Sequence, residues 1–107
     1  MVQSADFSMA NRMLSQEPSI VLLDVRTEEE YVAGHADGAV LLDVAEINED
    51  SAARVIPSLS TPVLVYCRSG YRSHKAAVKL DALGYQAVYD LGSLAGWPYG
   101  MTYGLEP

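Results

Sequence analysis

The sequence predicts an α/β fold with three layers, in which helices cover both faces of a mostly parallel sheet of about four to five strands. Two observations predict it. Apolar runs of strand length alternate with segments of helical periodicity along the whole chain, which is the pattern of βαβ units. The runs at 19–25 and 63–67 are apolar at consecutive positions, as expected for parallel strands that are buried on both faces.

The size of the chain predicts one domain that spans residues 1–107. A chain of 107 residues, half of them apolar, is long enough to bury a single core. Fourteen acidic residues against seven basic ones give a net charge of −7. Nucleic acids and anionic membranes attract the opposite charge. We therefore expect neither as a partner.

The location that the sequence predicts is the cytoplasm. The first ten residues have neither the basic start nor the apolar stretch of a secretory signal, and no apolar run approaches the length of a membrane span. The single cysteine excludes an internal disulfide, which favours a reducing compartment.

The first third of the chain predicts helix, strand and helix. Apolar residues recur at helical spacing over 8–16, with Ser8 as the candidate N-cap. The apolar strand 19–25 follows. Thr27 then offers an N-cap to a short helix. The first turn of this helix contains three glutamates, whose negative charge is stabilising at the N-terminal end of the helix dipole. Gly34 is expected to end this helix.

The middle of the chain predicts a short strand followed by an interrupted helix. Residues 39–42 form an apolar run directly after an Asp-Gly turn. Apolar residues at helical spacing continue over 43–56, and we expect a break in that helix near 49–51. Pro57 is expected to end it.

The last part predicts strand, helix and strand. Strand 63–67 leads into a loop and a helix, which Gly84 is expected to end in the left-handed conformation. Residues 86–91 form the last predicted strand, followed by a glycine-rich connection. The tail 101–107 is either an additional edge strand or disordered.

Cys67 lies where the strand 63–67 meets the following loop and helix. In α/β proteins the start of a helix after a parallel strand is a common place for anions and reactive groups. Four of the seven basic residues follow the cysteine closely, at Arg68, Arg72, Lys75 and Lys79. An acidic protein therefore has one local basic site.

The surroundings of Cys67 favour its reactive thiolate form. The helix N-terminus, the guanidinium groups of Arg68 and Arg72, and backbone N–H groups around a turn at Gly70 each stabilise an anion. The alternative is that Cys67 is a small apolar residue of the core, which is the usual role of a lone cysteine. The coincidence of strand end, glycine, two arginines and helix start favours a chemical role.

Three segments of the chain carry a recognisable set of motifs. Residues 22–39 contain D-V-R, E-[FY], G-H and G-A in this order, CRSGYRS follows at 67–73 and LGSLAGW at 91–97. Together they resemble the single-domain rhodanese family of thiosulfate sulfurtransferases, and 22–39 resembles its signature. The matching residues are Asp24, Val25, Arg26, Glu30, Tyr31, Gly34, His35, Gly38 and Ala39. Residues 67–73, CRSGYRS, resemble its active-site loop. The segment 91–97, LGSLAGW, resembles its closing G-G-x-x-x-W element, with Ser93 where the second paired glycine is expected.

The resemblance implies a three-layer rhodanese-like fold and double-displacement chemistry through a persulfide on Cys67. The implied donor is a small sulfur anion such as thiosulfate, and the implied acceptor is cyanide or a thiol, including the cysteine of another protein. Substrate-binding roles are implied for Arg68, Ser69, Gly70, Tyr71, Arg72 and Ser73. Roles in supporting the site are implied for Asp24, Arg26, His35 and Trp97. The first strand of the family fold is not identified in this sequence.

Two alternatives to an independent sulfurtransferase remain open. Cysteine phosphatases and arsenate reductases place a thiolate in a C-x5-R loop, but Ser73 stands at the required arginine position and the arginine lies at 72. A second cysteine is also absent. The other alternative is a sulfur-relay or docking module that serves a dedicated protein acceptor. Cys67 is the feature that discriminates here, because inactive rhodanese-like modules generally lack this cysteine and this chain has it.

No cofactor or metal is expected. His35 and His74 are the only histidines, and with a single cysteine they form no zinc motif. His35 is predicted to be a hydrogen-bonded structural residue.

Overall fold

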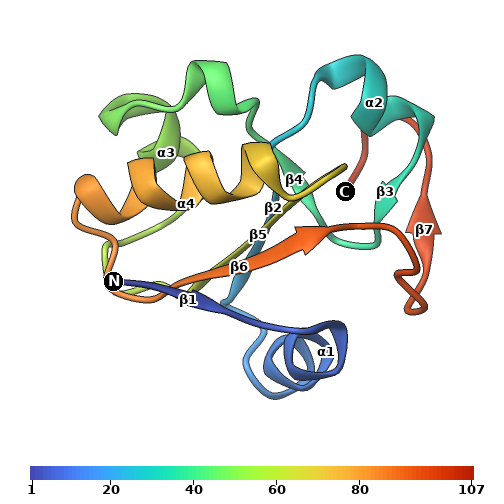
Figure 1. The fold of residues 1–107 in the computed structure, drawn as a ribbon, viewed down its shortest axis with the longest axis horizontal. Helices are drawn as coiled ribbons and strands as arrows, with labels where there is room; N and C mark the ends of the chain where they lie inside the picture. The colour runs from blue at the N-terminus through green and yellow to red at the C-terminus, as the bar shows by residue number, and fades with distance from the viewer.

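The computed structural model describes all 107 residues and contains a five-stranded sheet in the order β1-β6-β5-β2-β4 (Figure 1). Every pairing in this sheet is parallel. The strands are β1 (Val2–Ser4), β2 (Val21–Asp24), β4 (Val40–Leu41), β5 (Val63–Cys67) and β6 (Val88–Ser93). The predicted parallel sheet is confirmed.

Helices lie on both faces of the sheet, as predicted. They are α1 (Phe7–Gln16), α2 (Glu28–Ala33), the 3-10 helix η1 (Val44–Glu46), α3 (Glu49–Val55) and α4 (Tyr71–Ala82). Figure 1 shows α1 on one side of the sheet and α3 and α4 on the other. No helix is both long and apolar enough to cross a lipid bilayer.

The central strand β5 explains why the sequence is apolar at consecutive positions. All five of its residues are buried. Val63, Val65 and Cys67 pack in the cluster that includes residues of α3 and α4, whereas Leu64 and Tyr66 pack in the cluster that includes residues of α1 and α2. A strand buried on both faces has no polar alternation.

Strand β1 was not predicted. It is three residues long, pairs with β6 at the edge of the sheet, and exposes Gln3 and Ser4. A short edge strand with two polar residues has neither the length nor the apolar pattern that identifies a strand.

The helix starts show one wrong prediction and one confirmed one. Asp6, and not Ser8, is the N-cap of α1, because its carboxylate accepts the backbone N–H of Met9 at 2.8 Å. Thr27 caps α2 as predicted and forms a capping box with Glu30, in which each side chain accepts the other residue's backbone N–H.

The predicted break in the middle helix occurs, but earlier than expected. The 3-10 helix η1 ends at Glu46 and α3 begins at Glu49. Asn48 caps α3 by accepting the backbone N–H of Ser51 at 2.9 Å. The break thus lies at 47–48 and not at 49–51, since the asparagine side chain replaces a helical hydrogen bond there.

The tail forms an edge strand, which decides between the two predicted alternatives. Strand β7 (Met101–Thr102) pairs antiparallel with β3 (His35–Ala36) in a separate two-stranded sheet. Further along, the backbone N–H of Gly104 donates to Val32 at the end of α2. The last residues of the chain therefore lie beside the segment that follows β2.

Candidate active site

Cys67 is the last residue of β5, and its sulfur faces the start of α4. The backbone N–H of Gly70 donates to the Cys67 Sγ at 2.8 Å. Gly70 adopts a left-handed conformation, with φ of +93°, and is the N-cap of α4. A side chain there would meet no close atom, so the backbone angle is what requires glycine. The Cys67 side chain itself is buried.

The loop after Cys67 is short. It comprises residues 68–70, and Tyr71, Arg72 and Ser73 form the first turn of α4. Ser73 is buried, and its hydroxyl donates to the Gly70 carbonyl at 3.1 Å. The serine side chain therefore supports the loop from the helix side.

Ser93 holds the other side of this loop. It is the register partner of Cys67 on the neighbouring strand β6. Its hydroxyl donates to the Arg68 carbonyl at 2.6 Å and accepts the backbone N–H of Ala95 at 3.1 Å. The departure from the paired glycines thus adds a side-chain bridge from β6 to the loop.

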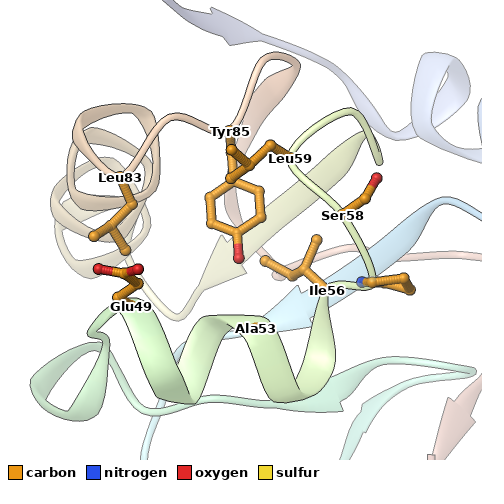
Figure 2. Close-up of a pocket in the computed structure, with 8 residues that line it drawn as sticks. Glu49, Ala53, Ile56, Ser58, Leu59, Leu83 and Tyr85 are labelled. Atoms are coloured by element: carbon orange, nitrogen blue, oxygen red, sulfur yellow. The ribbon is translucent and has the colours of Figure 1, made fainter.

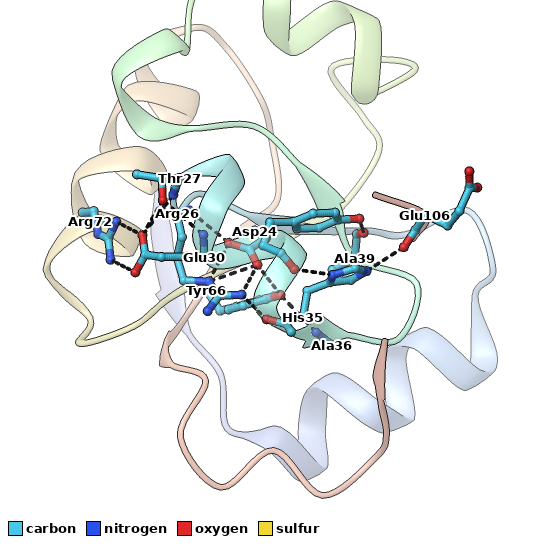
Figure 3. Close-up of polar contacts among 12 residues, drawn as sticks. Asp24, Arg26, Thr27, Glu30, His35, Ala36, Ala39, Tyr66, Arg72 and Glu106 are labelled. Atoms are coloured by element: carbon cyan, nitrogen blue, oxygen red, sulfur yellow. Dashed lines mark hydrogen bonds and ion pairs between the residues drawn. The ribbon is translucent and has the colours of Figure 1, made fainter. Parts of the chain in front are cut away.

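Arg72 points to Glu30 on α2 and forms a bidentate ion pair with it (Figure 3). The two nitrogen–oxygen distances are 2.6 and 2.9 Å. The hydrogen bond from Arg72 is the main cause that lowers the pKa of Glu30 to about 2. The pKa of Arg72 is raised, first by the hydrogen bond to Glu30 and further by the nearby charge of Cys67. Arg72 therefore lies within electrostatic reach of the sulfur while its charge is balanced by Glu30.

Arg68 differs from Arg72, because its side chain is exposed and forms no ion pair. It lines two shallow pockets, which also share Arg26 and Met101. Ser69 and Tyr71 are exposed as well, Tyr71 to 73%. These three exposed residues belong to the loop and the helix start that follow the buried Cys67.

Asp24 and Arg26 form a buried ion pair at the end of β2 (Figure 3). The Arg26 guanidinium donates to both Asp24 carboxylate oxygens, at 2.7 to 3.1 Å, and to the Gly34 carbonyl at 2.6 Å. The Tyr66 hydroxyl donates to Asp24 at 2.6 Å and accepts the backbone N–H of Ala36. Burial opposes the charge of Arg26, but Asp24 outweighs this effect and raises the pKa of Arg26.

His35 is buried, and its two hydrogen bonds go to α2 and to the end of the chain, not to the cysteine loop. Its Nδ1 lies 2.8 Å from the Tyr31 carbonyl, and its Nε2 lies 2.7 Å from the Glu106 carbonyl. The imidazole stacks on the Tyr31 ring at 3.6 Å between centroids. The predicted hydrogen-bonded surroundings of His35 are present, and they connect α2 with the end of the chain.

Trp97 lines one side of the pocket next to Arg68. Its ring makes edge contacts with Phe7 and Tyr99, at 5.2 and 5.1 Å between centroids, and its indole N–H donates to the Gly100 carbonyl at 3.1 Å. The tryptophan therefore packs against neighbouring aromatic residues and also lines the pocket next to Arg68.

Residues 8–98 match the family model described as the Rhodanese-like domain. The chain belongs to the rhodanese-like family. The predicted resemblance is thus confirmed, and the match includes the cysteine loop and the closing segment with Trp97.

Several similar proteins are named thiosulfate sulfurtransferase. The chain is 34% identical to Thiosulfate sulfurtransferase 18 of Arabidopsis thaliana, over 85% of this chain and 74% of that protein. It is 32% identical to Thiosulfate sulfurtransferase GlpE of Tolumonas auensis, over 84% and 83% of the two chains. It is also 34% identical to tRNA uridine(34) hydroxylase of Chlamydia trachomatis, but spans only 28% of that longer protein.

Solved structures show the same rhodanese-like arrangement. The Alr3790 protein from Anabaena superposes with a TM-score of 0.85 at 25% identity, over 95% of this chain and 94% of that one. A structure described as rhodanese with anions from E. coli gives a TM-score of 0.73 at 30% identity, over 78% and 98%.

Three contributors to this rhodanese-like site were not identified as such from the sequence: Glu30, Tyr66 and Ser93. Glu30 and Ser93 were noted only as positions in the motif segments, and their contacts with Arg72 and Arg68 join parts of the fold that are far apart in sequence. Tyr66 carried one available signal. A hydroxyl-bearing residue next to the cysteine in a buried strand requires a hydrogen-bond partner.

A separate pocket of about 260 Å³ lies at the other end of the molecule (Figure 2). Its lining includes Ile56, Leu59, Leu83 and Tyr85. Leu83 follows the last turn of α4, whereas Cys67 precedes the first turn. This pocket therefore lies apart from the cysteine loop.

Proposed function

We propose that this protein is a sulfurtransferase that carries a sulfane sulfur on Cys67 as a persulfide. The contact between the Gly70 N–H and the Cys67 sulfur carries the proposal. An N–H donor at a helix N-terminus stabilises negative charge on sulfur, both in the thiolate and in a terminal persulfide. The relatives named thiosulfate sulfurtransferase support the same chemistry.

The first step loads the sulfur. The Cys67 thiolate attacks the outer sulfur of thiosulfate and forms a new sulfur–sulfur bond. The sulfur–sulfur bond of thiosulfate breaks, and sulfite leaves with the bonding electron pair. The enzyme keeps a persulfide with one negative charge, so neither an external oxidant nor a proton is required.

The second step unloads the sulfur. The persulfide anion first takes a proton from solvent, and the thiolate of an acceptor then attacks its outer sulfur. The bond between the two enzyme sulfurs breaks, and Cys67 leaves as a thiolate. The acceptor gains the sulfur and its proton as a persulfide, whereas cyanide would become thiocyanate.

Arg68 is our candidate for the first contact with the donor dianion, because its charge is exposed and unpaired. Arg72 would act from its fixed position beside Glu30 and balance the charge that collects at the sulfur. Since the thiol is buried, the donor has to displace exposed loop side chains. Ser69 and Tyr71 are the exposed neighbours of Arg68 available for this movement.

The chemistry requires a free thiol, so we propose that the protein works in a reducing compartment such as the cytoplasm. An intact-mass measurement after incubation with thiosulfate tests the function. We expect a gain of one sulfur atom on the wild type, removed by cyanide or a reductant, and no gain on Cys67→Ser. An unmodified wild type, or an equal gain on the variant, would overturn the proposal.

The fate of the loaded sulfur separates free turnover from a relay. Fast loading together with slow transfer to small thiols would indicate a dedicated protein acceptor. Stopped samples taken after removal of excess thiosulfate measure the two half-reactions separately.

A further inference from the structure

Exposed apolar side chains gather on the chain segment 99–105, which includes β7. They occupy alternate positions, with exposed fractions of 40% for Tyr99, 38% for Met101, 70% for Tyr103 and 64% for Leu105. The residues between them hold the segment to the rest of the molecule. The Thr102 hydroxyl donates to the Asp37 carboxylate at 2.6 Å, and the Gly104 N–H donates to the Val32 carbonyl at 2.9 Å.

Segment 99–105 adjoins two pockets that are also lined by Arg68 of the cysteine loop. Two shallow pockets, of about 390 and 320 Å³, share Arg26, Arg68 and Met101. One extends to Trp97 and the other to Tyr103. We name the two pockets together the Arg68 groove. Arg68 directly follows Cys67, and Leu94, which lines the same pocket, donates its backbone N–H to the Cys67 carbonyl at 2.9 Å. An occupant of the groove therefore lies next to the residue that carries the sulfur.

The charge of the groove favours one negative group in the occupant. Arg26 is balanced by Asp24, and the neighbouring Arg72 is balanced by Glu30. Arg68 has no such partner. An anion bound there would supply the missing charge.

The size and composition of the surface favour a protein over a small thiol. Each pocket alone is in the size range of small-ligand sites, above about 300 Å³, and far larger than thiosulfate or cyanide requires. Apolar side chains continue beyond the groove to Tyr99 and Leu105, where a small thiol would leave them exposed. Tyrosine, tryptophan, methionine and arginine are the residue types enriched at the centres of protein interfaces.

We propose that the Arg68 groove and segment 99–105 together bind a protein that accepts sulfur through a cysteine on an exposed, extended segment, with an Asp or Glu beside that cysteine. This inference rests on the proposed function. The acidic residue of the acceptor would pair with Arg68, and apolar residues next to the acceptor cysteine would cover Met101 and Tyr103. The acceptor thiolate then attacks the outer sulfur of the Cys67 persulfide, Cys67 leaves as a thiolate, and the acceptor cysteine becomes the persulfide.

Transfer to synthetic acceptors tests this docking. The wild type is loaded with thiosulfate, freed of excess donor, and mixed with a heptapeptide that has a single cysteine flanked by leucine and aspartate. A matched peptide with lysine in place of aspartate and N-acetylcysteine serve as comparisons, all at equal thiolate concentration. We expect the acidic peptide to discharge the persulfide about fivefold faster than N-acetylcysteine, with the lysine peptide slower than the acidic one.

Variants locate the effect on the surface. In Tyr103→Ser and Met101→Ser, the ratio of the acidic-peptide rate to the cyanide rate should fall about threefold or more. Leu59→Ser removes an apolar side chain that is 48% exposed next to Leu83 and Tyr85, and should leave this ratio unchanged. Thermal unfolding confirms that each variant is folded.

The outcomes separate the two proposals. A wild type that never gains sulfur overturns the proposed function. A wild type that loads sulfur and releases it to cyanide, but discharges to the acidic peptide no faster than to N-acetylcysteine, overturns the docking surface alone. So does an unchanged rate ratio in both groove variants.

Discussion

Arg72 and Glu30 join the first turns of α4 and α2 through two parallel hydrogen bonds. Glu30 also accepts the backbone N–H of Thr27 at 3.0 Å, so one carboxylate completes the cap of α2 and fixes the arginine beside the cysteine loop. Loss of this carboxylate should therefore affect both the stability of the fold and the electrostatics of the sulfur site.

Acid should weaken this contact over a defined pH range. The pKa of Glu30 is lowered from 4.5 to about 2 in the folded state, mainly by Arg72. A lowered folded pKa contributes stability that is fully present above 4.5 and is lost as the pH falls through 2. The free energy of unfolding should fall more steeply between about pH 5 and pH 2 in the wild type than in Glu30→Gln.

The wild type and Glu30→Gln should differ in this pH-dependent loss of stability by about 1 to 2 kcal/mol. This is less than the full pKa shift implies, because the side chains of Glu30 and Arg72 are partly solvated, with exposed fractions of 24% and 28%. Denaturant unfolding at several pH values measures it. Parallel pH profiles for the two proteins would show that the ion pair does not stabilise the fold.

The two loop arginines should differ in what their removal changes. Arg68→Ala should raise the KM for thiosulfate about tenfold with almost no effect on stability, because this side chain is exposed and unpaired. Arg72→Ala should raise the KM several-fold and also lower the free energy of unfolding by about 1 kcal/mol, since Glu30 loses its partner.

Arg12→Ala is the matched control, because Arg12 is exposed on α1 and bonds only to Ser8. Steady-state kinetics and denaturant unfolding distinguish the three variants. An unchanged KM in Arg68→Ala would contradict its role in holding the donor.

The parallel sheet was predictable because its central strands are buried on both faces. Consecutive apolar residues at 63–67 are typical of a strand that is buried on both faces, and all five are buried. Strand β1 was not predictable, since Gln3 and Ser4 are exposed and its only partner is β6. Its existence depends on hydrogen bonds with residues far along the chain. Such pairing has no signal in a three-residue segment.

Apart from the residues that the family resemblance supplied, the site was predictable only where its residues are neighbours in sequence. The cysteine, the glycine turn and the helix start lie within 67–71. The contacts of Glu30 with Arg72 and of Ser93 with Arg68 depend on how α2 and β6 are placed in space. Sequence reasoning treated Arg68 and Arg72 alike as anion-binding residues, whereas tertiary packing pairs Arg72 with Glu30 and leaves Arg68 unpaired.

Ser93 should stabilise the cysteine loop measurably. Ser93→Ala removes the 2.6 Å bond to the Arg68 carbonyl and should slow sulfur loading while costing about 1 kcal/mol of stability. Ser93→Gly restores the family pattern but adds backbone freedom, so we expect an equal or larger loss. Loading rates from quenched mass measurements test this role. A Ser93→Gly variant that loads faster than the wild type would exclude it.

Gly70 should be the least replaceable residue of the loop for conformational reasons. Gly70→Ala places a side chain at φ of +93°, which costs about 1 kcal/mol or more even though no atom obstructs it. A shift of this backbone also moves the N–H that donates to Cys67, so loading should slow by about tenfold or more. Gly38→Ala is a matched control, since its φ is +82° in open space away from the sulfur. It should lose similar stability and keep its loading rate.

The buried pair of Asp24 and Arg26 should be the most sensitive electrostatic contact in the fold. Asp24→Asn keeps the shape of the side chain but leaves the Arg26 charge without a buried counter-ion, which costs about 3 to 5 kcal/mol. Tyr66→Phe removes one hydroxyl and should cost about 1 to 2 kcal/mol, because Asp24 and the Ala36 N–H each lose one bond. The expected order in thermal and denaturant unfolding is wild type, then Tyr66→Phe, then Asp24→Asn. If Asp24→Asn lost no more stability than Tyr66→Phe, Arg26 would have to be solvated in the variant. The buried charge pair would then not be what holds the Gly34 carbonyl beside the end of β2.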